Sequence, residues 1–234
     1  MPIVRILLVL LALASPLSMA GGAAAGPFED ARAAHGRKDY ATALRLLRPL
    51  ADQGHAEAQY ALGFMYDRGQ GVPKNYAEAA KWWRLAADQG NTVAQFNLGS
   101  LYDDGKGVPQ NKAEALKLYH LAAERGNDRA QFSVGTLHFA GVAVPQNRTE
   151  AAKWFRRAAD QGHIGGQVYL ALSYATGLGV PQDNVQAYMW LSVAAARGDK
   201  DAISNRNKVA QKMTPAQIAD AQKLARDWKP KPER

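Results

Sequence analysis

The side chains that most often carry out chemistry are sparse in this sequence. Its 234 residues include five histidines and no cysteine, which excludes thiolate nucleophiles, thiolate zinc sites and disulfides. No phosphate-binding loop is present, and the carboxylates Glu57, Asp67, Asp103 and Asp104 have the spacing of a solvated helix face. The sequence therefore predicts no catalytic residue, no metal site and no cofactor. The histidines are His35, His55, His120, His138 and His163.

The elements that hold these residues follow a period of 36 residues. Four consecutive blocks start at Ala56, Thr92, Asp128 and Ile164, with no insertion or deletion between them. Within each block, glutamine recurs at position 4, glycine at positions 14 and 35, and a Val-Pro pair at positions 17 and 18. A fixed period of this length is typical of stacked helical repeats.

Each block is predicted to form two helices. The first covers roughly positions 1 to 13 and ends at a Gly-x-Gly-Val-Pro loop, because proline prevents the helix from continuing. In the second, an Asn or Asp N-cap is followed three residues later by Glu or Gln, the pattern of a capping box. Apolar residues then recur with helical spacing. The N-caps are Asn75, Asn111, Asn147 and Asp183, and the tryptophans interpreted as packing residues are Trp82, Trp83, Trp154 and Trp190.

The block pattern A-x-A-Q-x-x-L-G-x-x-Y-x-x-G-x-G-V-P-x-N-x-x-E-A resembles the Sel1-like repeat. It runs almost unbroken from Ala56 to Asn91, whereas the third block departs from it with Ala143 in place of the second loop glycine. The resemblance implies an all-α, right-handed α/α solenoid, similar to tetratricopeptide repeats, that binds other proteins. The family also has a cysteine-rich secreted branch with penicillin-related activity, which does not carry over to a chain without cysteine.

The repeat explains three of the histidines. His55 and His163 occupy equivalent turn positions where Asn or Asp stands in other blocks, which favours a helix-capping role over a metal or catalytic one. His138 stands where the other blocks have tyrosine, which predicts a packed core residue.

The flanking segments are expected to complete the solenoid as capping units, since an open stack would expose its last apolar surface. Residues 27–55 are predicted to form a degenerate N-terminal repeat, 56–199 the four repeats, and 200–228 a helical cap. Within that cap we expect one helix over 201–213 and a second that begins at the N-cap Thr214. Together these units amount to about twelve helices, followed by a disordered tail over 229–234.

Residues 1–20 are typical of a secretory signal peptide. Arg5 precedes nine apolar residues, and Ser18 and Ala20 place small side chains before a cleavage site. The alternative, a membrane anchor, requires about 20 apolar residues. No cysteine follows the apolar run, which excludes a lipoprotein anchor. We therefore expect a periplasmic or secreted protein without a transmembrane anchor after cleavage.

The formal charge of +8 lies mostly at the C-terminal end. Residues 200–234 contain nine Lys or Arg and four Asp or Glu, whereas the four repeats together contribute only +1. This distribution does not support nucleic-acid binding along the solenoid. It is interpreted as a solubilising end cap, with contact to an anionic envelope surface as the alternative.

Projecting the first helix at about 100° per residue separates two faces. Positions 3, 4, 7, 8 and 11 form the packing face, and positions 2, 5, 9 and 12 lie opposite. In tetratricopeptide-like solenoids the first helices line the concave groove, so the resemblance makes this opposite face the candidate binding surface. The alternative, that position 5 packs against the next repeat, stays open. The candidates are Tyr60, Phe64, Asp67, Phe96, Ser100, Asp103, Phe132, Thr136 and Phe139.

These observations predict a non-enzymatic scaffold or regulator of the bacterial envelope that binds a protein partner. By resemblance, that partner is a membrane sensor or an envelope assembly protein. Two alternatives are a polysaccharide- or peptidoglycan-binding protein, whose aromatic rings would stack on sugars, and a cell-wall hydrolase. A hydrolase needs polar residues that break the repeat and converge in one groove, and the sequence shows no such cluster.

Overall fold

The computed structural model describes residues 26–231, which form twelve α-helices and contain no strand. The predicted signal peptide lies outside these residues. The all-α fold and the predicted helix number are confirmed. The helices are α1 (Pro27–Gly36), α2 (Tyr40–Asp52), α3 (Ala56–Arg68), α4 (Tyr76–Asp88), α5 (Thr92–Asp104), α6 (Lys112–Glu124), α7 (Asp128–Ala140), α8 (Arg148–Asp160), α9 (Ile164–Thr176), α10 (Asn184–Ala195), α11 (Lys200–Ala210) and α12 (Pro215–Asp227).

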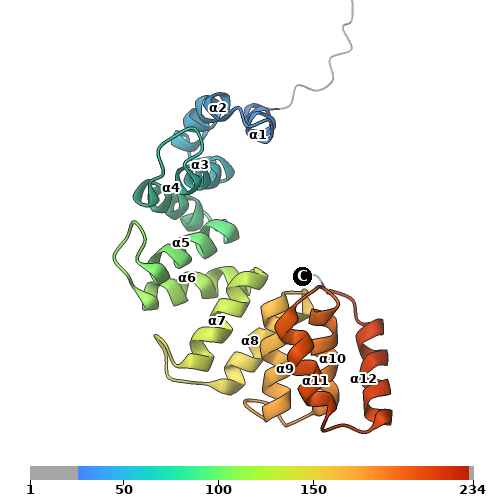
Figure 1. Ribbon diagram of the computed structural model, residues 1–234. Helices are drawn as coiled ribbons and strands as arrows, with labels where there is room; N and C mark the ends of the chain where they lie inside the picture. The colour runs from blue at the N-terminus through green and yellow to red at the C-terminus, as the bar shows by residue number, and fades with distance from the viewer. Residues whose placement is uncertain (1–25, 232–234) are drawn as a thin grey trace, which may run out of the picture.

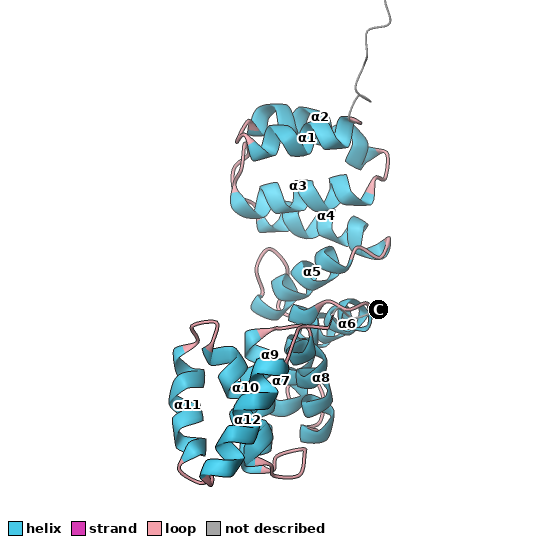
Figure 2. Ribbon diagram, turned by 90° about the vertical axis from the view of Figure 1, so that its right-hand side faces the viewer, coloured by secondary structure: helices cyan, strands magenta, loops and turns pink. Residues whose placement is uncertain are grey.

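The helices pack as successive pairs along a curved path (Figure 1). Each helix contacts the next one in the chain, from α1 to α11, so contacts remain local to neighbouring units. The view turned by 90° shows the pairs stacked one below another with loops at both ends (Figure 2). In Figure 1, α1 and α3 lie on the side of the curve that faces the C-terminal end, and α2 and α4 lie on the outer side.

The loop after each first helix begins at a residue that needs the left-handed backbone region. Gly69, for example, has φ 66° and ends α3, with its N–H donating to the carbonyl of Met65. Two residues further on, Gly71 also has positive φ, and a Cβ there would lie 2.8 Å from the Cβ of Tyr40 in the preceding unit. Ala143 adopts the same conformation, with φ 64°, despite its side chain.

The second helices are capped as predicted, but only half of each capping box forms. Asn75 Oδ1 accepts from the backbone N–H groups of Ala77 and Glu78, at 3.0 and 3.1 Å. The reciprocal bond from Asn75 N–H to a glutamate was wrongly expected, because this N–H donates instead to the carbonyl of Tyr66, at 2.9 Å. Among the twelve described helices the complete box occurs once, where Thr214 and Gln217 bond reciprocally at the start of α12.

A repeated buried glutamine joins each unit to the one before it. Gln95, 4% exposed, donates from Nε2 to the carbonyl of Ala87 at 3.1 Å, near the C-terminal end of α4. The Ala87 carbonyl also accepts the N–H of Gly90 at 2.8 Å, so the glutamine occupies its second acceptor position and pairs its own buried amide group across the junction. The equivalent bonds are Gln59 to Ala51, Gln131 to Ala123 and Gln167 to Ala159.

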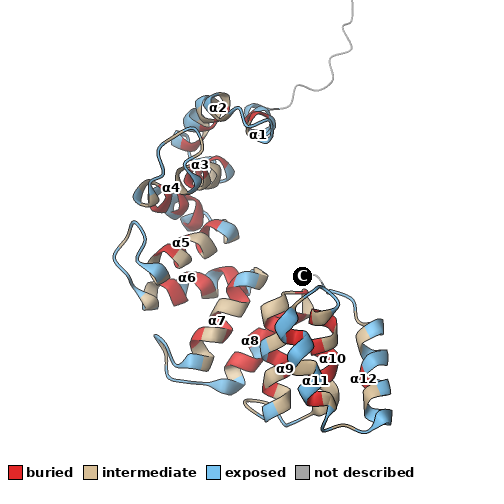
Figure 3. Ribbon diagram, viewed as in Figure 1, coloured by how far each residue is buried: buried red, intermediate tan, exposed pale blue. Residues whose placement is uncertain are grey.

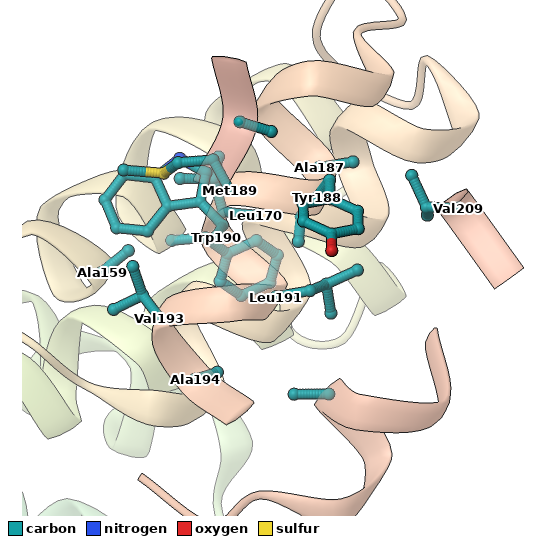
Figure 4. Close-up of a cluster of buried hydrophobic side chains, with 14 of the residues drawn as sticks. Ala159, Leu170, Ala187, Tyr188, Met189, Trp190, Leu191, Val193, Ala194 and Val209 are labelled. Atoms are coloured by element: carbon teal, nitrogen blue, oxygen red, sulfur yellow. The ribbon is translucent and has the colours of Figure 1, made fainter. Parts of the chain in front are cut away.

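Apolar residues fill the space between the helices, and the exposed side chains lie on their outer faces (Figure 3). The four tryptophans predicted to pack, on α4, α8 and α10, are each no more than 4% exposed, which confirms that prediction. Position 10 of the first helix, which the projection left off the packing face, is also buried, as Met65 shows. The largest cluster centres on α10, where Trp190 and Leu191 pack with Leu170 and Val209 (Figure 4).

Both C-terminal helices pack on α10 and make few contacts with each other. The helix predicted over 201–213 ends earlier, at Ala210. The reason is that Thr214, which precedes Pro215, must be extended, so the chain leaves the helix through a short turn. The tail predicted to be disordered is described as far as Lys231, whose N–H donates to the carbonyl of Asp160 at 2.7 Å. Residues 232–234 lie outside the described part.

Candidate partner-binding surface

The nine candidate residues lie on α3, α5 and α7, and each is half-buried. This exposure is intermediate between that of a core and that of a free surface, so the neighbours of each side chain decide its role. Tyr60, Phe64, Asp67 and Ser100 line one pocket of about 330 Å³ between α3 and α5. The other five do not line it.

The pocket combines aromatic walls with a charged rim. Its basic residues, Arg68, Lys74, Lys106 and Arg129, outnumber its acidic residues, Asp67 and Asp104. Four of these six charges form two ion pairs, since Lys106 Nζ lies 2.7 Å from Asp104 and Arg68 Nε lies 3.2 Å from Asp67.

A second, more apolar pocket adjoins the first. It encloses about 290 Å³ between α1, α2 and α3 and is lined by Ala31, His35 and Leu47. Tyr60 and Phe64 line both pockets, so these two rings form the wall between them. The two cavities therefore make one continuous surface over the N-terminal units.

Three candidate residues, Ser100 of the pocket lining among them, are held by contacts within the protein. Asp103 pairs with Lys112 at 2.6 Å, and Ser100 Oγ donates to the carbonyl of Phe96 at 3.1 Å. Thr136 Oγ1 donates to the carbonyl of Ser133 at 2.8 Å. These side chains fix the local conformation of their own repeats.

The phenylalanines of this face pack against neighbouring rings. Phe132 stacks on His163 with ring centroids 4.8 Å apart, and both Phe132 and Phe139 contact Tyr169 at 5.5 and 6.1 Å. Phe132 is the position-5 residue of its repeat, and here it packs against the next repeat, as the alternative interpretation predicted. The ring centroid of Phe96 lies 5.5 Å from that of Tyr119 in its own repeat. The guanidinium carbon of Arg129 lies 5.2 Å from the same Phe96 centroid.

The tyrosine hydroxyls of this face stay protonated at neutral pH. Burial raises the pKa of Tyr60 above its usual value, with Arg129 acting in the opposite direction. Burial also raises the pKa of Tyr119 to about 12, against the effect of its hydrogen bond to Ser100. Both hydroxyls are therefore neutral, and that of the buried Tyr119 donates to Ser100 Oγ at 3.3 Å.

Four of the five histidines form two helix caps and one pair of rings, whereas His35 bonds Gln70 Oε1 at 2.8 Å. Nδ1 of His55 accepts from the N–H of Ala58 at 3.4 Å, and Nδ1 of His163 from that of Gly166 at 3.1 Å, which confirms their predicted capping role. His138 is half-buried and lies beside His120, with ring centroids 5.8 Å apart. No group of three or more metal-ligating residues occurs in the part of the chain that the structure describes.

A family model for the Sel1 repeat matches five segments of the chain: residues 34–55, 56–91, 92–127, 128–163 and 165–199. The chain belongs to the Sel1 repeat family. Three of these segments begin at the block boundaries found from the period. The first assigns part of the degenerate N-terminal unit to the same family, so this Sel1 repeat protein has five repeats.

Two solved structures support the same fold. The chain is 30% identical to a Sel1 repeat protein from Oxalobacter formigenes, with a TM-score of 0.71 over 84% of this chain and 85% of that one. It is 29% identical to c5321, a protective antigen of uropathogenic Escherichia coli, with a TM-score of 0.59. That match covers 87% of this chain and 52% of the antigen. A comparison with curated proteins gives no match. Within residues 26–231, no helix has the length and apolar character needed to cross a bilayer.

Proposed function

We propose that this Sel1 repeat protein is a non-enzymatic scaffold of the bacterial envelope that binds a protein partner across α1, α3 and α5. The observation that carries the proposal is the pair of adjoining pockets that share Tyr60 and Phe64. Solenoid proteins use extended surfaces of this kind to bind partners, and rigid aromatic walls are typical of binding hot spots.

The two pockets suit a protein segment with both apolar and charged side chains. The pocket beside α1 is lined mainly by apolar atoms and would take an aliphatic or aromatic side chain. The pocket beside α5 has an excess of basic groups on its rim and would take an acidic side chain. A membrane sensor or envelope assembly protein that exposes such a segment is the partner class we propose.

The test is a photo-crosslinking amino acid placed at Asn97, on the rim of the charged pocket, and in a separate strain at Lys81, an exposed position on α4. We expect a protein partner to be crosslinked in the native cell from Asn97 and not from Lys81. Equal crosslinking from both positions would contradict the proposed surface. Capture of peptidoglycan fragments without protein would favour the polysaccharide-binding alternative.

A pocket-filling variant then tests the surface with the purified partner. Ala61 lines the apolar pocket and is half-buried, so Ala61→Arg fills the space without removing a core side chain. We expect affinity to fall about tenfold or more, because a desolvated anchor loses its pocket. Ala77→Arg, at an exposed position on α4, is the matched control and should bind as the wild type does. Unchanged binding of Ala61→Arg would place the partner elsewhere.

The envelope location rests on the sequence of residues 1–20. If the proposal holds, the protein purified from the native cell begins at Gly21, and intact-mass measurement detects the loss of twenty residues. A protein that retains Met1 in the cytoplasmic fraction would contradict the envelope location.

A further inference from the structure

We propose that the C-terminal cap contains a binding site for a small organic anion, a carboxylate or phosphate attached to an apolar body. The site is a cavity of about 450 Å³ between α10, α11 and α12. It is separate from the surface proposed for the protein partner, so each proposal stands or fails without the other. Its principal lining residues are Tyr188, Ser192, Arg197, Arg206, Arg226 and Trp228.

The cavity exists because the repeat pattern breaks at this end of the solenoid. Since α11 and α12 both pack on α10 and hardly on each other, a cleft opens between them with α10 as its floor. Ser192 stands at the repeat position that Arg84 and Arg156 occupy in earlier units, where each arginine reaches a tyrosine of the next repeat. The small serine leaves this space unfilled.

The charge of the cavity favours an anion. Arg197 follows α10, Arg206 lies on α11 and Arg226 lies on α12, and none of them forms an ion pair with a carboxylate among residues 26–231. No Asp or Glu lines the cavity. Arg197 donates to the carbonyl of Gly162, and the Arg206 guanidinium lies 6.0 Å from the Tyr188 ring centroid, so both are positioned without being neutralised.

Two buried polar atoms on residues that line the cavity have no partner. Ser192 Oγ and Trp228 Nε1 are both inaccessible to solvent and form no hydrogen bond within the described residues. The indole N–H groups of Trp82, Trp154 and Trp190, outside this cavity, are unpaired in the same way, and all of these atoms are closed to solvent. The groups that would bind the anion are therefore the guanidinium groups that line the cavity.

The remaining lining selects for an apolar body on the ligand. Val193, Ala196 and Ala225 give the cavity a mainly apolar surface beside the Trp228 ring. Guanidinium groups bind carboxylate and phosphate oxygens in a bidentate manner, which a neutral ligand cannot exploit. A volume of about 450 Å³ lies within the range of small-molecule sites.

The test is isothermal titration calorimetry of the full mature protein with octanoate, octyl phosphate and octanol. We expect both anions to bind and octanol not to bind, because only the anions satisfy the arginines. The stronger of the two anions identifies the head group. Binding of octanol with the same affinity as octanoate would overturn the proposal, as would the absence of any binding.

Matched charge variants separate a site from a generally basic surface. Arg206→Gln with Arg226→Gln removes two charges from the cavity, and we expect at least about a tenfold loss of octanoate affinity. Lys200→Gln with Lys208→Gln removes two exposed charges of the same cap outside the cavity and should leave the affinity unchanged. An equal loss in both double variants would show that only the overall charge acts. Circular dichroism confirms that each variant is folded.

Discussion

At the scale of single residues, Ala143 departs from the repeat by placing a side chain where the other three blocks have glycine. It holds φ 64°, a conformation that costs a residue with a Cβ about 1–2 kcal/mol. The equivalent glycines lie against the preceding unit, where a Cβ at Gly107 would come within 2.3 Å of the backbone of Tyr76. Ala143 is exposed, so the loop of this repeat stands clear of the unit before it.

Ala143→Gly is therefore expected to stabilise the protein by about 0.5–1 kcal/mol. The substitution relieves the backbone strain, and the greater entropy of glycine in the unfolded chain offsets part of that gain. Urea unfolding followed by circular dichroism measures the change. Ala219→Gly, at an exposed helical position of α12, is the control and should destabilise by about 1 kcal/mol. If both substitutions destabilise, the strain at Ala143 is not significant.

A second residue-scale prediction concerns the cap at His163. Its Nδ1 accepts a backbone N–H only while the ring is neutral. Burial lowers the pKa of His163 below its usual value of 6.5; Asp128 opposes this, and Arg129 and Arg197 add to it. Because the folded pKa lies below the unfolded one, this contribution to stability is complete above pH 6.5. It is lost as the pH falls through 6.5 towards the folded pKa.

His163→Asn keeps a capping oxygen, as Asn91 and Asn127 do in other repeats, and removes the titration. We expect the free energy of unfolding to depend less on pH between 8 and 5 in this variant than in the wild type. His163→Ala removes the cap as well and should be about 1 kcal/mol less stable at pH 8. An unchanged pH dependence in His163→Asn would show that His163 does not titrate in this range.

A hydrogen bond could be predicted from the sequence where its two groups lie within a few residues of each other. The caps Asn75 and His163 follow from their own helices, since the groups they bond lie two or three residues away. The bond from Asn75 N–H to the Tyr66 carbonyl crosses the loop, and its competition with Glu78 is not visible in the spacing.

At the scale of elements, each junction between repeats joins a second helix to the first helix of the next unit. Arg84 on α4 and Arg156 on α8 each bond the hydroxyl of a tyrosine eighteen residues later, Tyr102 and Tyr174. At the central junction, between α6 and α7, the corresponding residues are His120 and His138. The loop at Ala143 follows α7 in the same repeat as His138, so two departures from the pattern fall in the third block.

This junction is expected to weaken in acid. Burial lowers the pKa of His120, and His138 lowers it further, while Glu124 and Glu150 oppose both effects. Since the folded pKa lies below 6.5, stability is present above that pH and declines as the pH falls through it. Arg157 also lies at this junction, where it pairs with Glu124 at 3.2 Å and its guanidinium lies over the Trp154 ring.

His120→Arg with His138→Tyr restores the pair of the other junctions and should remove this loss. Hydrogen exchange at pH 5 measures the stability of this junction. We expect the amides of α6 and α7 to be better protected in the variant than in the wild type. The α4–α5 junction, with its Arg84–Tyr102 contact, is the internal control and should exchange equally in both proteins. Equal protection of α6 and α7 would contradict the expected weakening.

The elements themselves were the most predictable level. The 13-residue first helices match the predicted positions because an Asn or His N-cap fixes each start and the loop glycine fixes each end. The candidate surface was less predictable, because helical projection places Phe132 and Tyr60 on the same face without showing what lies opposite each. The structure packs Phe132 onto His163 and Phe155, whereas Tyr60 borders two pockets.

At the scale of the whole molecule, the two ends of the solenoid are closed differently. The N-terminal unit resembles the others and needs only a shorter loop, since α1 and α2 pair as the repeats do. The C-terminal unit instead places two helices on α10 and returns the chain to α8 through the bond from Lys231 to Asp160. The C-terminal cluster on α10 therefore includes Ala202, Val209 and Ala221 of α11 and α12, which lie outside the repeats.

Detaching α12 should consequently unfold the solenoid from its C-terminal end. Ala221 is fully buried between α12 and α10, so Ala221→Glu places a charge where none can be solvated, whereas Ala219→Glu alters an exposed position of the same helix. Because contacts in a solenoid are confined to neighbours, we expect hydrogen exchange to rise in α9 to α12 of Ala221→Glu and to stay unchanged in α3 to α6. Ala219→Glu should match the wild type throughout. Uniform loss of protection along the chain would instead show that the twelve helices unfold as one cooperative unit, and the C-terminal cap would then stabilise the partner surface at the opposite end.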